Sequence, residues 1–533
     1  MHLRQLDVLG FRGIHRLSIH FSADMVLIGE NMWGKSSLLS ALSLIFNPEK
    51  ALYQFTLRDF HIPAEQTEPV RHLILLFTFA ESEKNEDSME YHLPYLQHHL
   101  LVDHPDGYQR LYLRVEGQIN ANNEVNTTYA FLNEKGEPIV VDDINNLVFS
   151  LIARHPVYRF RDARLNRAHH SFRFIRTEVQ DETQDEIRAV SDLLCYYFLN
   201  HKNMTEIKQD TTLLWHKAKS LCTKLKQDET HRLRKKLFFS LASLFVRNQR
   251  IHFGRFTRPI ILFEDPDARL HPRMVAIMWE LVSYLPVQRI TTTNSVELLS
   301  QVNLNAICRL VRTPEKINCF QLRRKDLGKE DFRRLTFHIH HNRSLALFSR
   351  MWILVEGESE VWILSELAKL LEINLEMEGI RIVEFAQSGL KPLLKYVQAM
   401  GIQWYVLTDG DEAGKKYGEI VEDMLDEEMV RADRITILPK RDIEHFFYAN
   451  GFADVFIRLA QWQIKSHSYP MSKIIQRAIQ RTSKPDLAIA LSNEIKKRGS
   501  QAIPLLFKRL FSKVLSLART WLFIYTVSCV KVR

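Results

Sequence analysis

The chain has 533 residues, and because a domain holds roughly 100–200 residues, this length excludes a single small module and predicts several domains. Hydrophobic residues make up 46% and charged residues 25%, which excludes a disordered chain, and 18 glycines and 17 prolines exclude a collagen-like or linker-dominated one. The net charge is +9, from 72 Lys and Arg against 63 Asp and Glu, so a polyanionic partner is permitted but not required.

The first half of the chain mixes strand and helix patterns. In chain order, hydrophobic periodicity predicts strand, turn, strand and strand within 2–28, a helix at 35–46, strands at 70–80 and 108–117, a strand at 259–263, a helix at 273–285 and a strand at 288–293. The run at 259–263 is continuously apolar, which is typical of a buried parallel strand. Residues 150–255 have a mostly helical pattern that is rich in Arg, Lys and His.

The second half alternates regularly after a break near residue 345, so we expect two α/β domains. In chain order, the patterns predict a strand at 351–355, a helix at 358–371, a strand at 380–385, a helix at 389–400, a strand at 404–408, a helix at 413–426 and a strand at 434–438. Residues 452–520 have a helical pattern. We interpret the apolar tail from Trp521 to Val530 as a packed strand or a C-terminal extension rather than a membrane anchor.

The cysteines indicate the compartment. They are five in number and form no C-x-x-C pair: Cys195, Cys222, Cys308, Cys319 and Cys529. This spacing excludes a zinc ribbon and a disulfide framework, and reduced thiols fit a cytosolic protein best. The amino terminus lacks the apolar core of a signal peptide, and no apolar run reaches the roughly 18 residues that span a bilayer. We therefore expect a cytoplasmic protein without a membrane partner.

A phosphate-binding motif lies between the first buried strand and the first helix. Gly29 to Ser36 fits G-x-x-x-x-G-K-[ST], in which the glycines let backbone N–H groups surround phosphates at a helix N-terminus. Lys35 would reach the β- and γ-phosphates, and the Ser36 hydroxyl would hold Mg²⁺. The alternative is a glycine turn with an exposed lysine, but the strand–loop–helix context favours nucleotide binding. The predicted nucleotide contacts are Gly29, Glu30, Asn31, Gly34, Lys35, Ser36 and Ser37.

Two acidic residues end the buried strand at 259–263. In P-loop ATPases one such carboxylate holds the water shell of Mg²⁺ and the next orients the attacking water. By position these catalytic roles fall to Glu264 and Asp265 respectively. The alternative is a strand end capped by acidic turn residues, which the pairing with the P-loop disfavours.

Further segments complete a resemblance to a known family. The run from Phe11 to Ile14, the stretch from Phe263 to Pro272 and the turn from Thr291 to Ser295 resemble the ABC-type ATPase heads of the RecF, SMC and OLD (overcoming lysogenization defect) proteins. The resemblance implies ATP sandwiched between two subunits, and hence a head-to-head homodimer. The usual Asp-Glu order is reversed, Asn294 replaces the sensing His, and residues 228–243 hold no clear Ser-Gly-Gly signature. These departures predict slow or conditional ATP turnover.

Four acids follow apolar strands of the second α/β domain. Glu356 comes directly after the first strand, and Glu360 shares a face with it if a helix begins there. Asp409 and Asp411 follow a later strand and would point the same way if that strand continues through 411. These hard oxygen donors suit two Mg²⁺ or Mn²⁺ ions, which could activate a water and stabilise the leaving oxygen of a phosphodiester. The alternative is capping of helix N-termini, which we accept for Glu358.

The pattern hhhEGxxE … DGDxAG resembles a Toprim domain, as found in topoisomerases, primases and OLD nucleases. An ATPase head followed by Toprim is the OLD-family order, and this resemblance covers most of the chain. It implies two further site residues: Glu444, in a segment like the late acidic motif, as a metal ligand, and Lys484, in a segment like the one that supplies a catalytic lysine. Lys484 would stabilise charge developing on the phosphate; the alternative is a solvated lysine at a helix start. The predicted metal ligands are Ser36 and Glu264 in the head and Glu356, Glu360, Asp409, Asp411 and Glu444 in the Toprim domain.

Arginines and aromatic residues interleave between residues 154 and 176. Arginine can neutralise phosphates and aromatic rings can stack on bases, so this stretch is a candidate DNA-binding segment. The candidate contacts are Arg159, Arg161, Arg164 and Arg173. The alternatives are a solvated face over core aromatics and contacts to ATP phosphates inside the head.

Together the patterns predict an α/β protein with an ABC-type ATPase domain at 1–345, a Toprim nuclease domain at 346–450 and a helical C-terminal region at 451–533 that completes the nuclease site. An insertion at about 90–240 is a candidate dimerisation region. We expect an ATP-binding, divalent-metal-dependent DNA endonuclease with one Mg²⁺ beside ATP and two Mg²⁺ or Mn²⁺ ions at the Toprim site. The expected partners are DNA and a second copy of the chain, and a helicase partner is left open. The alternative is an ATP-gated DNA clamp or sensor with a weak or inactive Toprim site.

Overall fold

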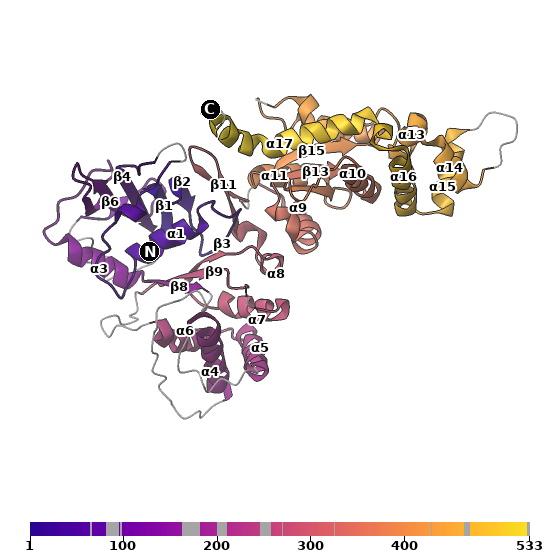
Figure 1. Cartoon of the computed structure of the whole chain (residues 1–533). Coiled ribbons are helices and arrows are strands. Elements are labelled where there is room, and N and C mark those ends of the chain that lie inside the picture. The colour runs from indigo at the N-terminus through magenta and orange to yellow at the C-terminus, as the bar shows by residue number, and fades with distance from the viewer. Residues whose placement is uncertain are drawn as a thin grey trace. The chain divides into compact units, whose positions relative to one another are not determined.

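The structure is a computed structural model of the whole chain (Figure 1). It describes residues 1–63, 67–81, 95, 99–161, 182–199, 211–245, 257–268, 270–323, 326–427, 429–462 and 470–529. The chain folds into two compact units, Met1–Gln321 (unit 1) and Leu322–Arg533 (unit 2). Each unit has a hydrophobic core of its own.

In the described residues, unit 1 is built on one twelve-stranded sheet whose amino-terminal part is antiparallel. β1 (His2–Phe11) pairs with β2 (Ile14–His20) through a tight turn and with β4 (His72–Ala80) on its other side. The strands beyond β4 are β6 (Gln109–Ile119), which pairs with β4, and then β5 (Val102–Asp103) and β7 (Val125–Phe131), which both pair with β6. Burial alternates along β1 because one face of this part meets the core.

The other part of this sheet is parallel and leads to the P-loop. Its strands run in the order β11 (Ile307–Arg312), β3 (Asp24–Ile28), β10 (Gln288–Thr292), β9 (Ile260–Glu264) and β8 (Val157–Arg161). β12 (Ile317–Gln321) joins the two parts by pairing with β11 and β2. Parallel neighbours end at the same edge, so the loop after β3 and the acids at the end of β9 meet there.

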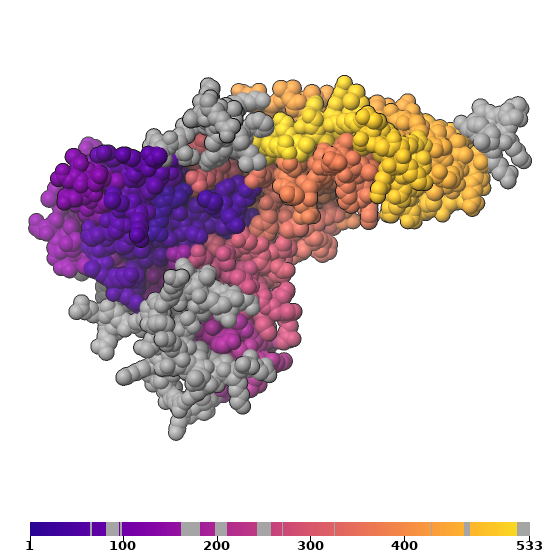
Figure 2. Space-filling model, viewed as in Figure 1, coloured from indigo at the N-terminus to yellow at the C-terminus, as the bar shows by residue number. Residues whose placement is uncertain are grey.

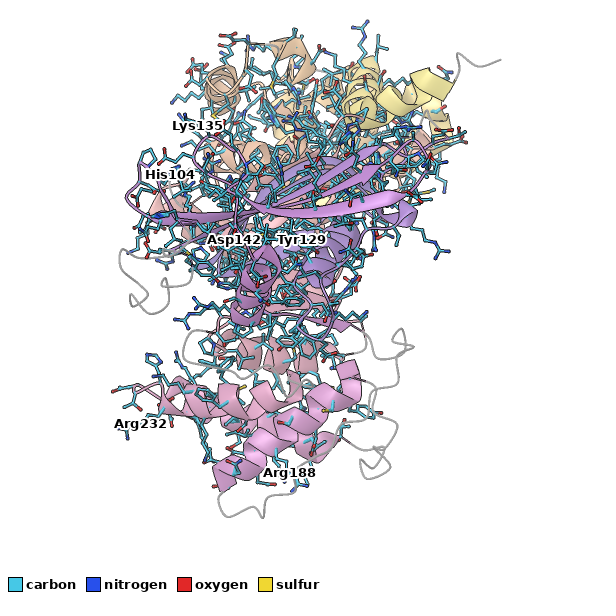
Figure 3. The ribbon with its side chains drawn as sticks, turned by 90° about the vertical axis from the view of Figure 1, so that its left-hand side faces the viewer. His104, Tyr129, Lys135, Asp142, Arg188 and Arg232 are labelled. Carbon is cyan, nitrogen blue, oxygen red and sulfur yellow. The ribbon has the colours of Figure 1, made fainter. Side chains whose placement is uncertain are left out.

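Helices cover the sheet of unit 1. They are α1 (Lys35–Ile45), α3 (Ile144–Arg154), α4 (Glu182–Leu194), α5 (Thr212–Lys226), α6 (Arg232–Phe245), α7 (Pro272–Ser283) and α8 (Val296–Leu299). Shorter turns of helix lie at Leu57–Asp59, Cys195–Leu199 and Leu304–Ala306. α4 packs on α5 and α6, and α5 packs on α7. Figure 3 shows α4, marked by Arg188, and α6, marked by Arg232, as a group apart from the strand that carries Tyr129.

Unit 2 holds a four-stranded parallel sheet in the order β14 (Ile380–Glu384), β13 (Met351–Val355), β15 (Gln403–Thr408) and β16 (Ile435–Ile437). The helices that connect these strands are α10 (Glu358–Leu370), α11 (Leu390–Ala399) and α12 (Glu412–Glu422). Ahead of the sheet lie α9 (Lys329–Leu335) and two short helical segments, Thr336–His341 and Ser344–Phe348. Every residue of β13 is buried, as expected of a parallel strand covered on both faces.

The C-terminal helices pack on this sheet and share its core. They are α13 (Ile443–Phe447), α14 (Ala453–Ala460), α15 (Met471–Arg481), α16 (Lys484–Arg498) and α17 (Leu505–Cys529), with short helical segments at Arg431–Asp433, Tyr448–Phe452 and Ser500–Ala502. Phe507 and Val514 of α17 belong to one hydrophobic cluster with Ile353 and Leu407 of the sheet. Figure 2 shows α17, in yellow, on the surface of this unit. Within the described ranges, none of the helices has both the length and the apolar character that a bilayer span requires.

The α/β fold class is confirmed, and the structure differs from the sequence patterns in two elements. Residues 157–161, within the stretch predicted as mostly helical, form strand β8, which pairs in parallel with β9. The tail from residue 521 to 529, predicted as a strand or an extension, continues helix α17. A short apolar run fits either structure when periodicity alone is used, and here the preceding helix decides.

Candidate functional site

The P-loop leaves β3 at Gly29 and enters α1 at Lys35. Gly34 has a φ of 92°, and a Cβ there would lie 2.6 Å from Cδ1 of Ile317, so this position needs glycine. A cavity of about 290 Å³ lies over the loop. The predicted nucleotide contacts that line it are Glu30, Asn31, Gly34, Lys35, Ser36 and Ser37.

Lys35 is held in a buried position at this cavity. Its Nζ donates to the carbonyl oxygen of Gly29 and, at 3.2 Å, to Oδ1 of Asn294. Burial lowers the pKa of Lys35, while the carboxylates of Asp265 and Glu30 act in the opposite direction. The ammonium therefore lies in a desolvated place, where its hydrogen-bond acceptors are neutral carbonyl oxygens. An anionic phosphate would supply the negative charge that these acceptors lack. The residues fit a nucleotide.

The acids at the end of β9 lie beside the P-loop. The Ser36 hydroxyl donates to Oε1 of Glu264 at 3.3 Å, so the two groups predicted to hold Mg²⁺ are neighbours. Asp265 has a φ of 46°, in the left-handed region, which Asp enters at less cost than most residues with a side chain. Burial raises the pKa of Asp265, and the nearby Asp267 adds to this effect. Backbone strain of this kind clusters at functional sites.

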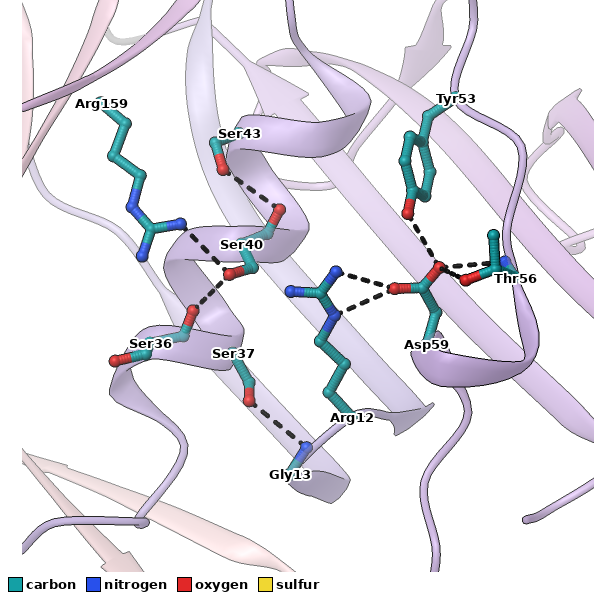
Figure 4. Close-up of polar contacts among 10 residues, drawn as sticks. All are labelled: Arg12, Gly13, Ser36, Ser37, Ser40, Ser43, Tyr53, Thr56, Asp59 and Arg159. Atoms are coloured by element: carbon teal, nitrogen blue, oxygen red, sulfur yellow. Dashed lines mark hydrogen bonds and ion pairs between the residues drawn. The ribbon is translucent and has the colours of Figure 1, made fainter. Parts of the chain in front are cut away.

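Arg159 reaches this site from β8. Its Nε and Nη2 donate to Oε2 of Glu264 at 3.0 and 2.7 Å, and its Nη1 donates to the Ser40 hydroxyl at 3.2 Å. Figure 4 shows the guanidinium beside Ser40, whose hydroxyl in turn donates to the Ser36 carbonyl at 2.7 Å. The structure thus places this arginine beside Glu264 and α1, and its contacts with DNA and with ATP phosphates both stay predictions. The Arg161 side chain, Arg164 and Arg173 lie outside the described residues.

Arg312 lines the cavity of the head and is not revealed by the sequence patterns, and Arg12 holds a nearby turn. Arg312, at the end of β11, lines the cavity and donates from Nη1 to the Met32 carbonyl at 3.0 Å. Arg12 donates to the buried carboxylate of Asp59 from Nε at 3.0 Å and Nη2 at 2.8 Å, which fixes the turn that follows β1 (Figure 4). Arg12 lies in the Phe11 to Ile14 run, which predicts only a turn, and a single arginine at a strand end carries no motif that could reveal Arg312.

In unit 2, Glu356 and Asp409 directly follow the neighbouring parallel strands β13 and β15. Their side chains therefore belong to one edge of the sheet. Oε2 of Glu356 is buried and accepts no hydrogen bond within the described ranges. Burial raises the pKa of Glu356 and Asp411 adds to the rise, whereas a hydrogen bond from the backbone N–H of Asp409 opposes it.

The carboxyl of Asp409 lies in the field of several other acids. Burial raises its pKa to about 8, and the charges of Glu360, Glu356, Asp442 and Glu444 contribute. Burial also raises the pKa of Glu360, to about 7, and that of Glu444. Burial and mutual repulsion therefore disfavour ionisation of these carboxyls unless a positive charge is nearby.

The geometry corrects two assumptions about these acids. β15 ends at Thr408, so Asp411 does not continue the strand, and its Oδ1 instead accepts the Gly414 N–H at 2.8 Å to cap α12. The helix after β13 begins at Glu358, as its pattern predicts, so Glu356 lies ahead of the helix and does not share a helical face with Glu360, whose Oε2 accepts the Gly357 N–H at 2.9 Å. Strand ends followed by a sharp turn explain both differences, because the turn redirects the next side chains.

Gly410 forces the turn between the two aspartates. A Cβ at this position would lie 2.3 Å from the carbonyl oxygens of both Leu438 and Lys440. The backbone N–H of Gly410 donates to the carbonyls of Lys440 and Arg441 at 3.1 and 3.2 Å. The loop after β15 is therefore pressed against the loop after β16, which leads to the segment of Asp442 and Glu444.

Glu444 and Lys484 join the acids from the C-terminal helices. Nζ of Lys484, the first residue of α16, lies 3.9 Å from Oε1 of Glu444. Asp442 caps α13 and accepts hydrogen bonds from the backbone N–H of His445 at 2.8 Å and from its Nδ1 at 2.6 Å. The sequence patterns do not single out His445, although its place next to Glu444 is a signal. The Lys484 side chain is 60% exposed.

The residues of this edge fit a divalent metal ion. Among the described residues, no three His, Cys, Asp or Glu side chains already converge tightly enough to hold one. Mg²⁺, however, keeps several of its waters and takes only one or two protein carboxylates. The orphaned oxygen of Glu356 and the buried carboxyl of Asp409 are oxygen donors that a divalent cation would satisfy. Their oxygen donors suit Mg²⁺ or Mn²⁺.

Comparisons with known proteins identify the family of the chain. Residues 1–346 match the family described as "Protein of unknown function (DUF2813)", and residues 347–411 match "Overcoming lysogenization defect protein-like, TOPRIM domain". The chain is 39% identical over 553 residues to the uncharacterized protein YbjD of Escherichia coli (strain K12), over 97% of this chain and 99% of that protein.

Two solved structures show limited similarity. The C-terminal region of the Xanthomonas campestris pv. campestris OLD protein is 18% identical over 32% of this chain and 95% of that chain, with a TM-score of 0.26. The SMC head domain from Thermotoga maritima is 12% identical over 61% of this chain and 100% of that chain, with a TM-score of 0.31. On the family matches and the E. coli relative, the chain belongs to the DUF2813 family and carries an OLD-like Toprim domain, which confirms the resemblance noted in its sequence.

Proposed function

We propose that the chain is an ATP-binding, divalent-metal-dependent DNA endonuclease in which an ABC-type ATPase head gates a Toprim nuclease site. The acid cluster around Asp409 carries this proposal. Helix capping accounts for Asp411 and for one oxygen of Glu360, but it does not account for a buried, unpartnered oxygen on Glu356. A cluster of this kind is unfavourable in an apo protein unless it serves a cation.

Each residue of the cluster has a role in this proposal. When bound, a divalent ion supplies Lewis-acid chemistry, lowering the pKa of water and neutralising phosphate charge. Glu356 and Asp409 would hold such ions, with Glu360, Asp411 and Glu444 as further ligands, directly or through water. The ammonium of Lys484 would stabilise negative charge that develops on the phosphate during cleavage.

In the head, Lys35 and the backbone of the P-loop would bind the phosphates of ATP, and Ser36 with Glu264 would hold its Mg²⁺. Asp265 would orient the attacking water. ATP binding would close or order a homodimer of heads, and hydrolysis would be slow or conditional. This assignment is supported by the cavity over the P-loop and by the buried ammonium of Lys35 within it.

Incubation of the purified protein with supercoiled plasmid tests the proposal. Mg²⁺ or Mn²⁺ is added with and without ATP, and nicked and linear products are separated on a gel. We expect metal-dependent cleavage that ATP changes. Asp409→Ala should abolish cleavage while ATP binding, measured in parallel, stays at the wild-type level. Cleavage retained by Asp409→Ala would refute the metal-site assignment.

An ATP-gated DNA clamp or sensor is the second candidate. It is favoured by Asn294, which accepts a hydrogen bond from Lys35 where the family resemblance leads one to expect a sensing His. A clamp would bind DNA in an ATP-dependent manner and would leave the plasmid supercoiled with either metal. That result would exclude the nuclease proposal.

A further inference from the structure

Arg159 and Glu264 form a two-pronged ion pair in the head. The arginine lies on β8, whose neighbour β9 ends at Glu264, and the two strands pair in parallel. The guanidinium donates two hydrogen bonds to one carboxylate oxygen, at 3.0 and 2.7 Å. The two side chains are 20% and 17% exposed, so water screens the pair only in part.

A third hydrogen bond ties the guanidinium to α1. Nη1 donates to the Ser40 hydroxyl at 3.2 Å, and that hydroxyl donates to the Ser36 carbonyl (Figure 4). The guanidinium therefore cannot swing away from Glu264 without giving up several hydrogen bonds. Arg159 is not among the described residues that line the nucleotide cavity, so it acts on the site through Glu264.

Both oxygens of Glu264 are already engaged. Oε1 accepts the Ser36 hydroxyl and Oε2 accepts Arg159. A guanidinium keeps its charge at any pH at which the protein is folded. A fixed positive charge beside this carboxylate repels a second cation and offsets the attraction that Glu264 alone would exert.

We infer that Arg159 is a built-in counter-ion of Glu264 that weakens the hold of the head on Mg²⁺ and so raises the Mg²⁺ concentration needed for tight ATP binding. The inference rests on the proposed ATP-binding function and adds a regulatory residue to it. It gives a physical reason for conditional nucleotide use, because the ion must compete with a charge that belongs to the protein. Loss of the charge should tighten Mg²⁺ binding.

The opposite effect on Mg²⁺ affinity would follow if Arg159 only oriented Glu264. A residue that merely positions a metal-holding carboxylate usually contributes about 10- to 100-fold to metal affinity, so its loss weakens metal binding. Arg159→Gln keeps an amide donor but no charge, and Arg159→Lys keeps the charge without the two-pronged contact. The two substitutions therefore separate charge from orientation.

The test measures ATPγS binding to the full-length protein by calorimetry while Mg²⁺ is raised from an EDTA-treated start. We expect Arg159→Gln to lower the half-saturating Mg²⁺ concentration about tenfold, and Arg159→Lys to stay within about twofold of wild type. Arg110→Gln serves as the charge control, because it removes an arginine of β6 that is ion-paired with Asp106 in the preceding turn. An unchanged or higher Mg²⁺ requirement for Arg159→Gln would overturn the inference.

Two further readouts keep the outcomes apart. Thermal melting shows whether Arg159→Gln is folded, and Arg159→Met replaces it as the charge-free variant if it is not. A wild-type protein that binds no ATPγS at any Mg²⁺ concentration would refute the proposed ATP-binding head itself. Wild-type binding together with an unshifted Arg159→Gln would refute only the role of Arg159.

Discussion

Replacing Asp409 by Asn should make unit 2 more stable in the absence of metal. Burial and four neighbouring carboxylates raise the pKa of Asp409 to about 8, against 3.8 for a free Asp. Asparagine has nearly the same shape but cannot ionise, so Asp409→Asn removes the repulsion and keeps the packing. The same substitution removes a proposed metal ligand, so it should also remove stabilisation by Mg²⁺.

The sign of the expected change in stability follows from the direction of the pKa change. A raised pKa means that the folded protein keeps this proton longer than the unfolded chain does. The stability that the protonated carboxyl contributes is full below about pH 4 and is lost as the pH rises through about 8. Because each pH unit of this window is worth about 1.4 kcal/mol, the upper bound is about 6 kcal/mol. Asp409 is only half-buried, and solvent screening reduces our expectation to about 2 kcal/mol.

Thermal melting of the full chain in EDTA at pH 5 and pH 8 measures this difference. Hydrogen exchange of peptides from β13 and β15 assigns the transition to unit 2. We expect Asp409→Asn to melt about 4–8 °C above wild type at pH 8, with a smaller gap at pH 5. Asp423→Asn, at an exposed acid that ends α12, should leave the melting temperature unchanged. The reasoning would be refuted if Asp409→Asn and wild type had the same melting temperature at pH 8, or if their melting temperatures differed more at pH 5 than at pH 8.

Three further substitutions have defined outcomes. Lys484→Ala should lower the rate of plasmid cleavage about 100-fold and leave the rise in melting temperature with Mg²⁺ intact; an unchanged rate contradicts its role. Gly410→Ala places a Cβ 2.3 Å from two carbonyl oxygens and should lower the free energy of unfolding, measured by chemical denaturation, by about 3 kcal/mol or more. Gly328→Ala is the control: its nearest contact is at 3.7 Å, and its free energy of unfolding should stay within about 0.5 kcal/mol of wild type. Lys35→Ala should weaken ATPγS binding at least about 100-fold by calorimetry without changing the Mg²⁺-dependent melting of unit 2; wild-type affinity would contradict the P-loop assignment.

The sequence is most informative where function depends on a short local pattern. The loop from Gly29 to Ser36 and the acids after β13 and β15 follow buried strands directly, so hydrophobic periodicity by itself puts them at strand ends. Parallel pairing then brings Glu356 and Asp409 to one edge. Local propensity and the tertiary fold agree at these positions, which is why the strand-end predictions succeed.

Contacts between distant segments cannot be predicted in this way. Arg159 and Glu264 are separated by 105 positions, and only the pairing of β8 with β9 brings them together, so the sequence suggests DNA for an arginine that is ion-paired with Glu264. The role of Asp411 depends on where β15 stops, and strand ends are the least certain part of a pattern. The Arg312 contact with the P-loop depends on the order of strands in the sheet.

The central claim is that the carboxylates of unit 2 form a metal-dependent nuclease site, and a matched pair of glutamates tests it most directly. Glu356 has a buried oxygen without a partner among the described residues, whereas Glu358, two residues on, is exposed at the start of α10. The measurement is the rate of supercoiled-plasmid cleavage in Mg²⁺ or Mn²⁺ by wild type, Glu356→Gln and Glu358→Gln. We predict a loss of about 100-fold or more for Glu356→Gln and a rate within about twofold of wild type for Glu358→Gln. Equal rates for the two variants would contradict the account.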